Sequence, residues 1–174
     1  MNELDEVWAR MLAEAKARVE AGGRGDVAEY LELKANNDAI RAACVKWLFD
    51  SALEIASQAN RENAAIAVEN ENPHSFVFGK SNLSGSLLRF RQGVRCLTVE
   101  AGWTRTPADG FMRGGALACA RITHFGLSRH NQELVLTRGE NLPNWLSVGK
   151  DGRRNLFDSK NLQHHFRVFL GTVY

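Results

Sequence analysis

The 174-residue sequence has few cysteines and no long apolar run, and both features limit what the protein can be. Its three cysteines, Cys44, Cys96 and Cys119, are widely spaced and set in apolar segments. We therefore expect reduced, buried thiols rather than a disulfide framework. No stretch approaches the roughly 20 apolar residues that a membrane span needs. The first residues are acidic and do not resemble a signal peptide, so we expect a soluble, cytoplasmic protein without membrane contact.

The sequence also lacks a strong excess of charge of one sign. Its 22 basic and 20 acidic side chains leave a net charge of +2. This balance argues against nucleic acid or an anionic membrane as a partner. The first 60 residues nevertheless hold more of the acids, and the rest of the chain holds most of the arginines. One face of a sheet built from the second part is therefore expected to be positive.

Motifs that would identify an enzyme or a metal site are missing from the sequence. There is no phosphate-binding G-x-x-x-x-G-K-S/T loop and no G-x-S-x-G nucleophile elbow. The five histidines match no known set of ligand spacings. His164 and His165 are adjacent on an expected strand, so they would point to opposite faces. We therefore expect neither a metal nor a cofactor.

The first 60 residues predict helices. Apolar residues recur at three- and four-residue spacing from Leu4 to Val19, with Asn2 suited to cap this helix and Gly22-Gly23 to end it. A second helical region runs from Val27 to about Asn60. The run 36–38, Asn-Asn-Asp, predicts a break in this region because these residues are poor helix formers and good caps.

The longer helix that follows this break is apolar over more than one face. Trp47, Leu48 and Phe49 stand in succession, so they cannot all face the same side. We expect this helix to pack between two surfaces. These are either the sheet and the first helix, or the sheet and a second subunit, which would make the protein a homodimer.

Beyond Asn60 the apolar period shifts toward two, and glycine and asparagine mark turns. All three prolines are expected in connections. The connections are short and contain no helical crossover, which favours antiparallel pairing. The expected strands are 64–69, 75–78, 84–91, 94–101, 116–125, 133–138, 145–148, 155–157 and 164–170.

These patterns together predict a single α+β domain over residues 1–174. About three N-terminal helices, within residues 1–60, pack on a mostly antiparallel, curved sheet of roughly six to eight strands within residues 61–174.

The loop from Gly102 to Gly115 is the segment with the densest functional chemistry. Connections of about 12 or more residues are uncommon and are often functional. We expect Trp103 to offer a stacking surface, Arg105 and Arg113 to offer charge, and Asp109 to orient one of the arginines. In the alternative interpretation the loop is structural, with Trp103, Phe111 and Met112 tucked into the core.

A second group of arginines lies in the first expected hairpin. Arg89 and Arg91 alternate with Leu88 and Phe90, which places both guanidinium groups on one sheet face, and Arg95 follows the turn. Such a group can bind a carboxylate or a phosphate. The alternative is a solvated sheet face whose arginines pair with the protein's own acids.

Three functional hypotheses follow from these residues. The first is a non-catalytic module that binds an anionic small molecule or an acidic protein through the loop. The second is an enzyme with a small pocket, in which His124 or His130 pairs with Asp109 as acid and base. The third is an assembly protein whose first helix binds a partner through Trp8, Met11 and Leu12.

Overall fold

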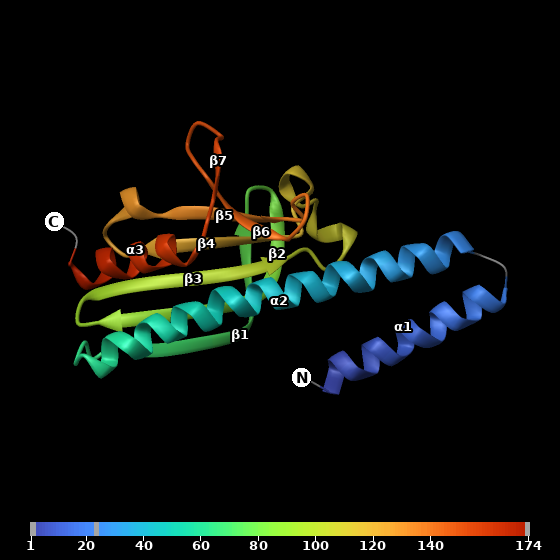
Figure 1. Cartoon of the computed structure of the whole chain (residues 1–174), viewed down its shortest axis with the longest axis horizontal. Helices are drawn as coiled ribbons and strands as arrows, with labels where there is room; N and C mark the ends of the chain where they lie inside the picture. The colour runs from blue at the N-terminus through green and yellow to red at the C-terminus, as the bar shows by residue number, and fades with distance from the viewer. Residues whose placement is uncertain (1–2, 23–24, 173–174) are drawn as a thin grey trace. The chain divides into compact units, whose positions relative to one another are not determined.

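In the computed structural model of the protein, residues 3–22 and 25–172 are described, with only the backbone described at 3–8 and 19–20 (Figure 1). The chain divides into two compact units, Met1–Ala42 and Ala43–Tyr174. Within the described residues, no helix is both long and apolar enough to cross a membrane.

The first unit contains helix α1 (Glu3–Ala21) and the first part of helix α2 (Gly25–Arg61). The predicted break at residues 36–38 is wrong, because α2 runs without interruption for 37 residues. Asp38 accepts a 2.8 Å hydrogen bond from Arg41 one turn later, which is a contact typical of a helix interior. The predicted cap at Asn2 lies outside the described residues.

The second unit contains one sheet whose seven strands follow one another in chain order, each antiparallel to the next. The α+β class, the helical N-terminus and the antiparallel sheet are thereby confirmed. The strands are β1 (Ala67–Phe78), β2 (Ser81–Gln92), β3 (Arg95–Trp103), β4 (Ala118–His124), β5 (Gln132–Thr137), β6 (Asn144–Val148) and β7 (Arg154–Leu156).

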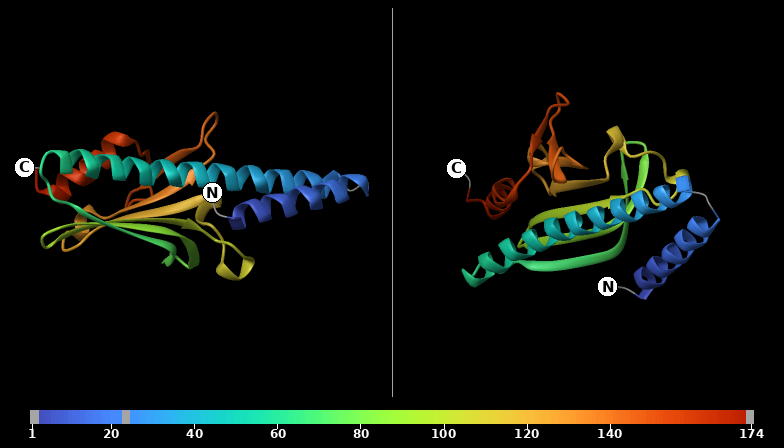
Figure 2. Two further views of the ribbon diagram at one scale, coloured as in Figure 1. Left: turned by 90° about the horizontal axis from the view of Figure 1, so that it is seen from below. Right: turned by 45° about the vertical axis from the view of Figure 1, so that its right-hand side comes forward.

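One face of the sheet is covered by the second part of α2 and by helix α3 (Ser159–Leu170) (Figure 2). In α2, Leu48, Ala52 and Ala56 repeat every fourth residue and are buried. Two of the three are alanines, which allow the helix backbone to come close to the sheet. The rings of Phe90 and Phe166 meet edge to face with centroids 5.1 Å apart, so α3 packs on the same core.

Helix α3 corrects the predicted strand at 164–170. The segment lacks the two-residue alternation of a half-exposed strand, and its buried side chains recur at helical spacing: Leu162, His165, Phe166, Val168 and Phe169. Asp158 caps the helix by accepting hydrogen bonds from the backbone of Lys160 and Asn161. Gly171 ends it in the left-handed conformation.

The other face of the sheet carries a second, smaller apolar cluster because the sheet bends. Figure 1 shows the free end of the β1–β2 hairpin turning away from the rest of the sheet. A register shift between Glu71 and His74 and a glycine at position 85 mark the bend. Pro73 lies at this shift inside β1, so its predicted place in a connection is wrong. The cluster is formed by Phe78, Leu83, Ala116, Cys119 and Val135.

Candidate functional site

The Gly102–Gly115 loop is an ordered segment that is held by its own hydrogen bonds. The Asp109 carboxylate accepts from the backbone nitrogens of Thr106 at 2.9 Å and Arg105 at 3.1 Å, and from the Thr106 hydroxyl at 3.1 Å. The Thr106 and Arg105 backbone N–H groups lower the pKa of Asp109. Asp109 therefore fixes the loop backbone. That it also orients an arginine side chain stays a prediction.

Arg105 lies flat over the indole of Trp103, with its guanidinium carbon 3.8 Å from the ring centroid. Its Nη2 also donates to the backbone oxygen of Ser84 at 3.0 Å. The stacking face of Trp103 is thus occupied by a side chain of the same loop, and Arg105 braces the loop against β2.

Arg113 extends from the loop toward β5. Its Nη1 lies 3.6 Å from the Glu133 carboxylate, and 59% of its side chain is exposed. Arg121 lies next to this pair and contacts both Glu133 at 3.8 Å and Glu100 at 3.1 Å. Glu100 in turn accepts from His74 at 2.8 Å. This charged row crosses β3, β4 and β5, and the sequence did not predict it because its members are distant in the chain.

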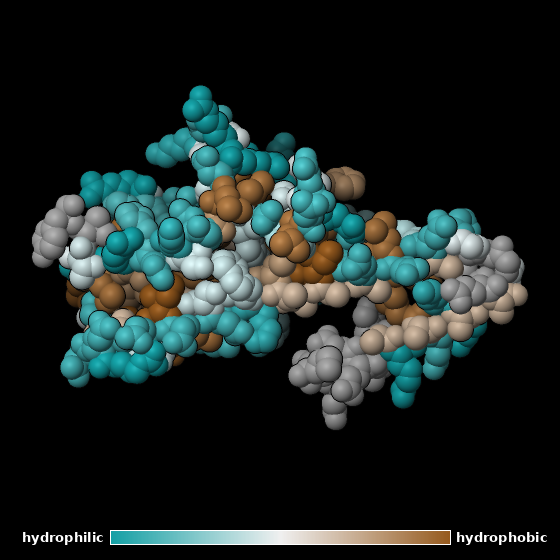
Figure 3. Space-filling model, in the orientation of Figure 1, coloured by the Kyte–Doolittle hydropathy of each residue, from teal (hydrophilic) through white to brown (hydrophobic). Residues whose placement is uncertain are grey.

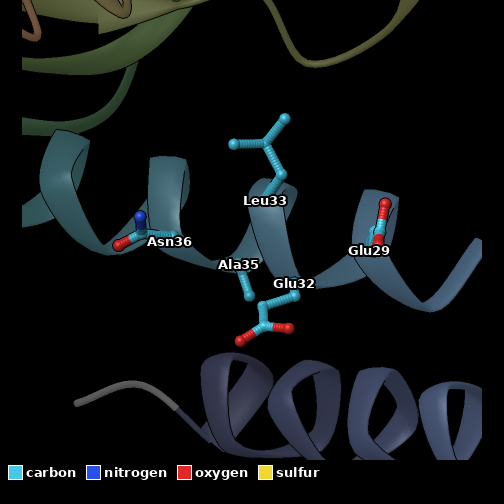
Figure 4. A pocket seen from close by; sticks show the side chains of 5 residues that line it. All are labelled: Glu29, Glu32, Leu33, Ala35 and Asn36. Atoms are coloured by element: carbon cyan, nitrogen blue, oxygen red, sulfur yellow. The ribbon is translucent and has the colours of Figure 1, made fainter. Parts of the chain in front are cut away.

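Two surface pockets lie away from the loop. One is on the N-terminal part of α2, beside Glu29, Glu32, Leu33, Ala35 and Asn36 (Figure 4). The other lies between α2 and α3, where its lining includes Asp50, Ser51 and Gln163. Neither of these two pockets is lined by residues of the loop.

Phe111 is the most exposed aromatic side chain of the loop. The side chain is 90% exposed, although the Ser81 hydroxyl holds its backbone oxygen at 2.6 Å. The neighbouring Met112 packs on the second apolar cluster. The structural interpretation of the loop is therefore right for Met112 and wrong for Phe111.

Positive groups lie on and beside the loop that carries Phe111. Arg105 is bonded to Ser84 and Phe111 to Ser81, and three residues of β2 span roughly 10 Å. Arg113 follows two residues after Phe111, and the guanidinium of Arg154 lies against Gly114. An exposed phenylalanine on a loop that also carries arginines is a composition typical of protein contacts.

The arginines of the first hairpin bind groups of the protein itself. Arg89 and Arg91 share one sheet face as predicted, and both contact Glu69, at 2.9 and 3.2 Å. Arg95 lies on the C-terminal end of α3, where its Nη1 is 3.5 Å from the Phe169 oxygen. A cation at that position favours the negative end of the helix dipole. Arg89 and Arg91 therefore fit the solvated-face interpretation, whereas Arg95 binds a main-chain oxygen instead of an acid.

Two histidines form a buried pair between the sheet and α3. His124 Nε2 lies 2.9 Å from His165 Nδ1, and His165 Nε2 lies 2.7 Å from the Gln132 amide oxygen. The amide oxygen can only accept, so His165 donates to it and accepts from His124. Burial lowers the pKa of His124 to about 4 and that of His165 to about 3.

Asp109 does not meet the histidines that the enzyme hypothesis requires. His124 pairs with Leu97, which pairs with Phe90, whereas the loop is bonded to Ser84. Six residues of β2 separate these points by roughly 20 Å. His130 does lie near His124, with ring centroids 5.9 Å apart.

The part of the chain that the structure describes holds no cluster of metal ligands, and burial makes the Cys119 thiol a poor nucleophile. No group of three or more His, Cys, Asp or Glu side chains there could hold a metal ion. Cys44, Cys96 and Cys119 are free thiols. Burial raises the pKa of Cys119 to about 12, which disfavours the reactive thiolate.

Comparison with known proteins adds no further assignment. No protein-family model, no curated protein sequence and no solved structure matches the chain.

Proposed function

We propose that the protein is a non-catalytic interaction module that binds an acidic protein segment through the loop surface around Phe111. The observation that supports this proposal is the 90% exposure of Phe111 on a loop whose backbone is held by hydrogen bonds to Asp109 and Ser81. An outward aromatic residue whose backbone is already held gives contact area at low entropic cost. Arg105 and Arg113 of the same loop, with Arg154 beside Gly114, favour a partner that carries carboxylates.

A small anionic molecule fits this surface less well than a protein does. Small ligands bind in concave sites that bury most of their surface. Here Arg105 covers Trp103 and also binds Ser84, while Arg113 faces Glu133. A protein partner could bury Phe111 and add its carboxylates to guanidinium groups that already have a fixed position.

The proposal is tested by selecting binding peptides from a random peptide library displayed on phage, with the full-length protein as bait. We expect selected peptides to combine an apolar residue with flanking Asp or Glu. Their affinity, measured by fluorescence anisotropy, should fall at least about tenfold in Phe111→Ser, and it should weaken as salt is raised.

Phe125→Ser is the matched control for this experiment. Phe125 is also exposed, at 76%, but it follows β4 at the end that pairs with Leu97. It should leave affinity unchanged. Peptides without acidic residues, or equal binding by wild type and Phe111→Ser, would refute the proposal.

An assembly role is a second candidate function. Its first-helix residues are only partly described: Met11 is 55% exposed and Leu12 is half-buried, whereas the side chain of Trp8 lies outside the described part. The exposure of Met11 supports contact with another chain, including a second copy.

The free thiols support a reducing compartment such as the cytoplasm as the site of action.

A further inference from the structure

Strand β7 is the last strand of the sheet and forms one of its edges. Among the described residues it pairs with β6 alone, and the strand order ends there. Figure 1 shows the β6–β7 hairpin standing out from the rest of the sheet, and in the space-filling view its tip projects as a hydrophilic knob (Figure 3). All three residues of the strand are exposed. Another chain can therefore reach this edge.

The backbone groups of Arg154 and Leu156 point to the open side of β7. The N–H of Phe157 donates to the oxygen of Trp145 at 2.9 Å, so Phe157 faces β6. Because backbone groups alternate in direction along an antiparallel strand, Asn155 also faces β6, whereas Arg154 and Leu156 face away. No turn or loop of the described residues bonds to these outward groups. They offer two donors and two acceptors to an added strand.

The side chains of Arg154 and Leu156 give this edge a defined chemistry. Both lie on the sheet face that carries Glu133 and Val135, because directly paired residues share a face. Leu156 is 58% exposed. The Arg154 guanidinium lies against Gly114 and makes no ion pair within the described part of the chain. The edge therefore presents an unpaired cation and an apolar side chain two residues apart.

We propose that the acidic segment of the partner binds as an added strand on the β7 edge, antiparallel to β7. This deepens the proposed function, on which it rests for the partner. An antiparallel segment continues the pairing of every other strand in the sheet. Opposite residues share a face, so an acid lies opposite Arg154 and an apolar residue opposite Leu156. Read from its N-terminus, the segment is therefore apolar, any residue, acidic.

Charge favours an acidic segment over a second copy of β7. Antiparallel pairing of two β7 strands about Asn155 would place Arg154 opposite Leu156 and leave both guanidinium groups without an acid. The hairpin tip adds Lys150 and Arg153, and its one acid, Asp151, already lies 3.3 Å from Arg153. Three residues give few backbone hydrogen bonds, so the side chains opposite Arg154 and Leu156 must supply much of the selectivity.

The first test is an NMR titration of isotope-labelled full-length protein with the N-acetylated peptide Thr-Val-Thr-Glu-Thr. We expect the amide signals of Arg154 and Leu156 to shift most and to saturate. The reversed peptide, Thr-Glu-Thr-Val-Thr, should bind at least about fivefold more weakly, because it places its acid opposite Leu156. Equal affinity of the two peptides overturns the proposal.

The second test leaves the protein unchanged and blocks the backbone of the peptide. In the proposed register the N–H groups of the valine and the glutamate face β7, whereas that of the central threonine faces away. N-methylation of the glutamate should therefore weaken binding at least about fivefold. N-methylation of the central threonine is the matched control and should leave the affinity nearly unchanged. Equal binding of the two N-methylated peptides overturns the proposal.

A charge reversal tests the contact with Arg154. Arg154→Glu should prefer the peptide that carries lysine in place of glutamate, which is the reverse of the wild-type preference. Arg153→Glu is the matched control, because Arg153 is exposed and adjacent but its backbone and side chain have the opposite directions along the hairpin. It should keep the wild-type preference. A preference that Arg154→Glu leaves unchanged overturns the proposal.

Phe111→Ser separates this proposal from the proposed function. If the amide signals of Arg154 and Leu156 respond to the peptide but phage-selected peptides bind Phe111→Ser as well as wild type, the loop surface fails and the edge stands. If the selected peptides need Phe111 but these two amide signals do not respond, only the edge is overturned. Shifts of the same signals with protein concentration alone overturn it too, because a second copy then occupies the edge.

Discussion

Most of the polar and charged side chains that the sequence marked as functional candidates bind other groups of the protein itself. Asp109 accepts three hydrogen bonds from its own loop, Arg105 binds Ser84, and Arg95 lies on the end of α3. His124 and His165 bind each other in the core. The buried pair is the feature at this scale with the clearest measurable consequence.

We predict that the protein loses stability as the pH falls from 7 to 5. The fold holds His124 and His165 neutral, with pKa values of about 4 and 3, whereas an unfolded histidine takes up a proton near pH 6.5. Below pH 6.5 the unfolded state therefore binds more protons, and the free energy of unfolding decreases. The expected loss is about 4 kcal/mol, or about 2 kcal/mol for each histidine, measured by urea unfolding at both pH values.

His165→Gln should reduce this pH dependence by about half, because His124 remains, whereas His164→Gln should retain it. His164 is the adjacent residue on α3 but is exposed. An equal pH slope in wild type and His165→Gln would show that other groups cause the loss.

At the scale of elements, two segments depend on short-range caps. The short helical turn Pro107–Asp109 inside the loop begins with the Thr106–Asp109 capping interaction. Helix α3 begins with the Asp158–Asn161 capping box. The α3 cap matters more for the core, because this helix contributes Phe166 and His165 to the sheet face.

We predict that Asp158→Ala lowers the free energy of unfolding by about 1 kcal/mol, because two backbone N–H groups of the first turn lose their acceptor. Ser159→Ala, one residue later, should change stability little. Chemical denaturation followed by circular dichroism measures both variants. A loss of equal size in the two variants would show that the cap is not the cause.

At the scale of the whole molecule, the chain combines an acidic helical unit with a basic sheet unit. Residues 1–42 contain six basic and nine acidic side chains, and residues 43–174 contain sixteen and eleven. The cores named above belong to the second unit, whereas the first has mainly surface. Folding is therefore expected to depend mainly on the second unit.

We predict that a chain beginning at Asn37 folds with a cooperative thermal transition within a few degrees of the full-length protein. It retains Leu48, Ala52 and Ala56 for the sheet. Differential scanning calorimetry measures the transition. Loss of the cooperative transition would show that the sheet unit needs the N-terminal helices.

The predictability of each feature follows from the range of the interactions that create it. The strands 84–91, 94–101 and 133–138 were predicted within a few residues, because alternation and turn residues are local signals. The break at 36–38 was wrong because helical neighbours on both sides outweigh the low propensity of Asn36 and Asn37. The strand at 164–170 was wrong because its apolar residues also fit a helical period.

In the candidate site, too, the locally encoded features were predictable and the long-range contacts were not. The loop was located from its length and composition, but the partners of its side chains were not. Contacts of Arg105 with Ser84 and of Arg113 with Glu133 join residues about 20 apart in the chain, and no local pattern contains them. The exposure of Phe111 also depends on how the loop packs.

By itself, the sequence determined the α+β class, the antiparallel sheet and the position of the chemically dense loop, because periodicity and turn chemistry act over a few residues. Only the tertiary structure decided which arginines bind the protein's own groups, which histidines are buried together and which aromatic side chain faces solvent. Those outcomes depend on burial and on contacts between distant segments, which exist only once the chain has folded.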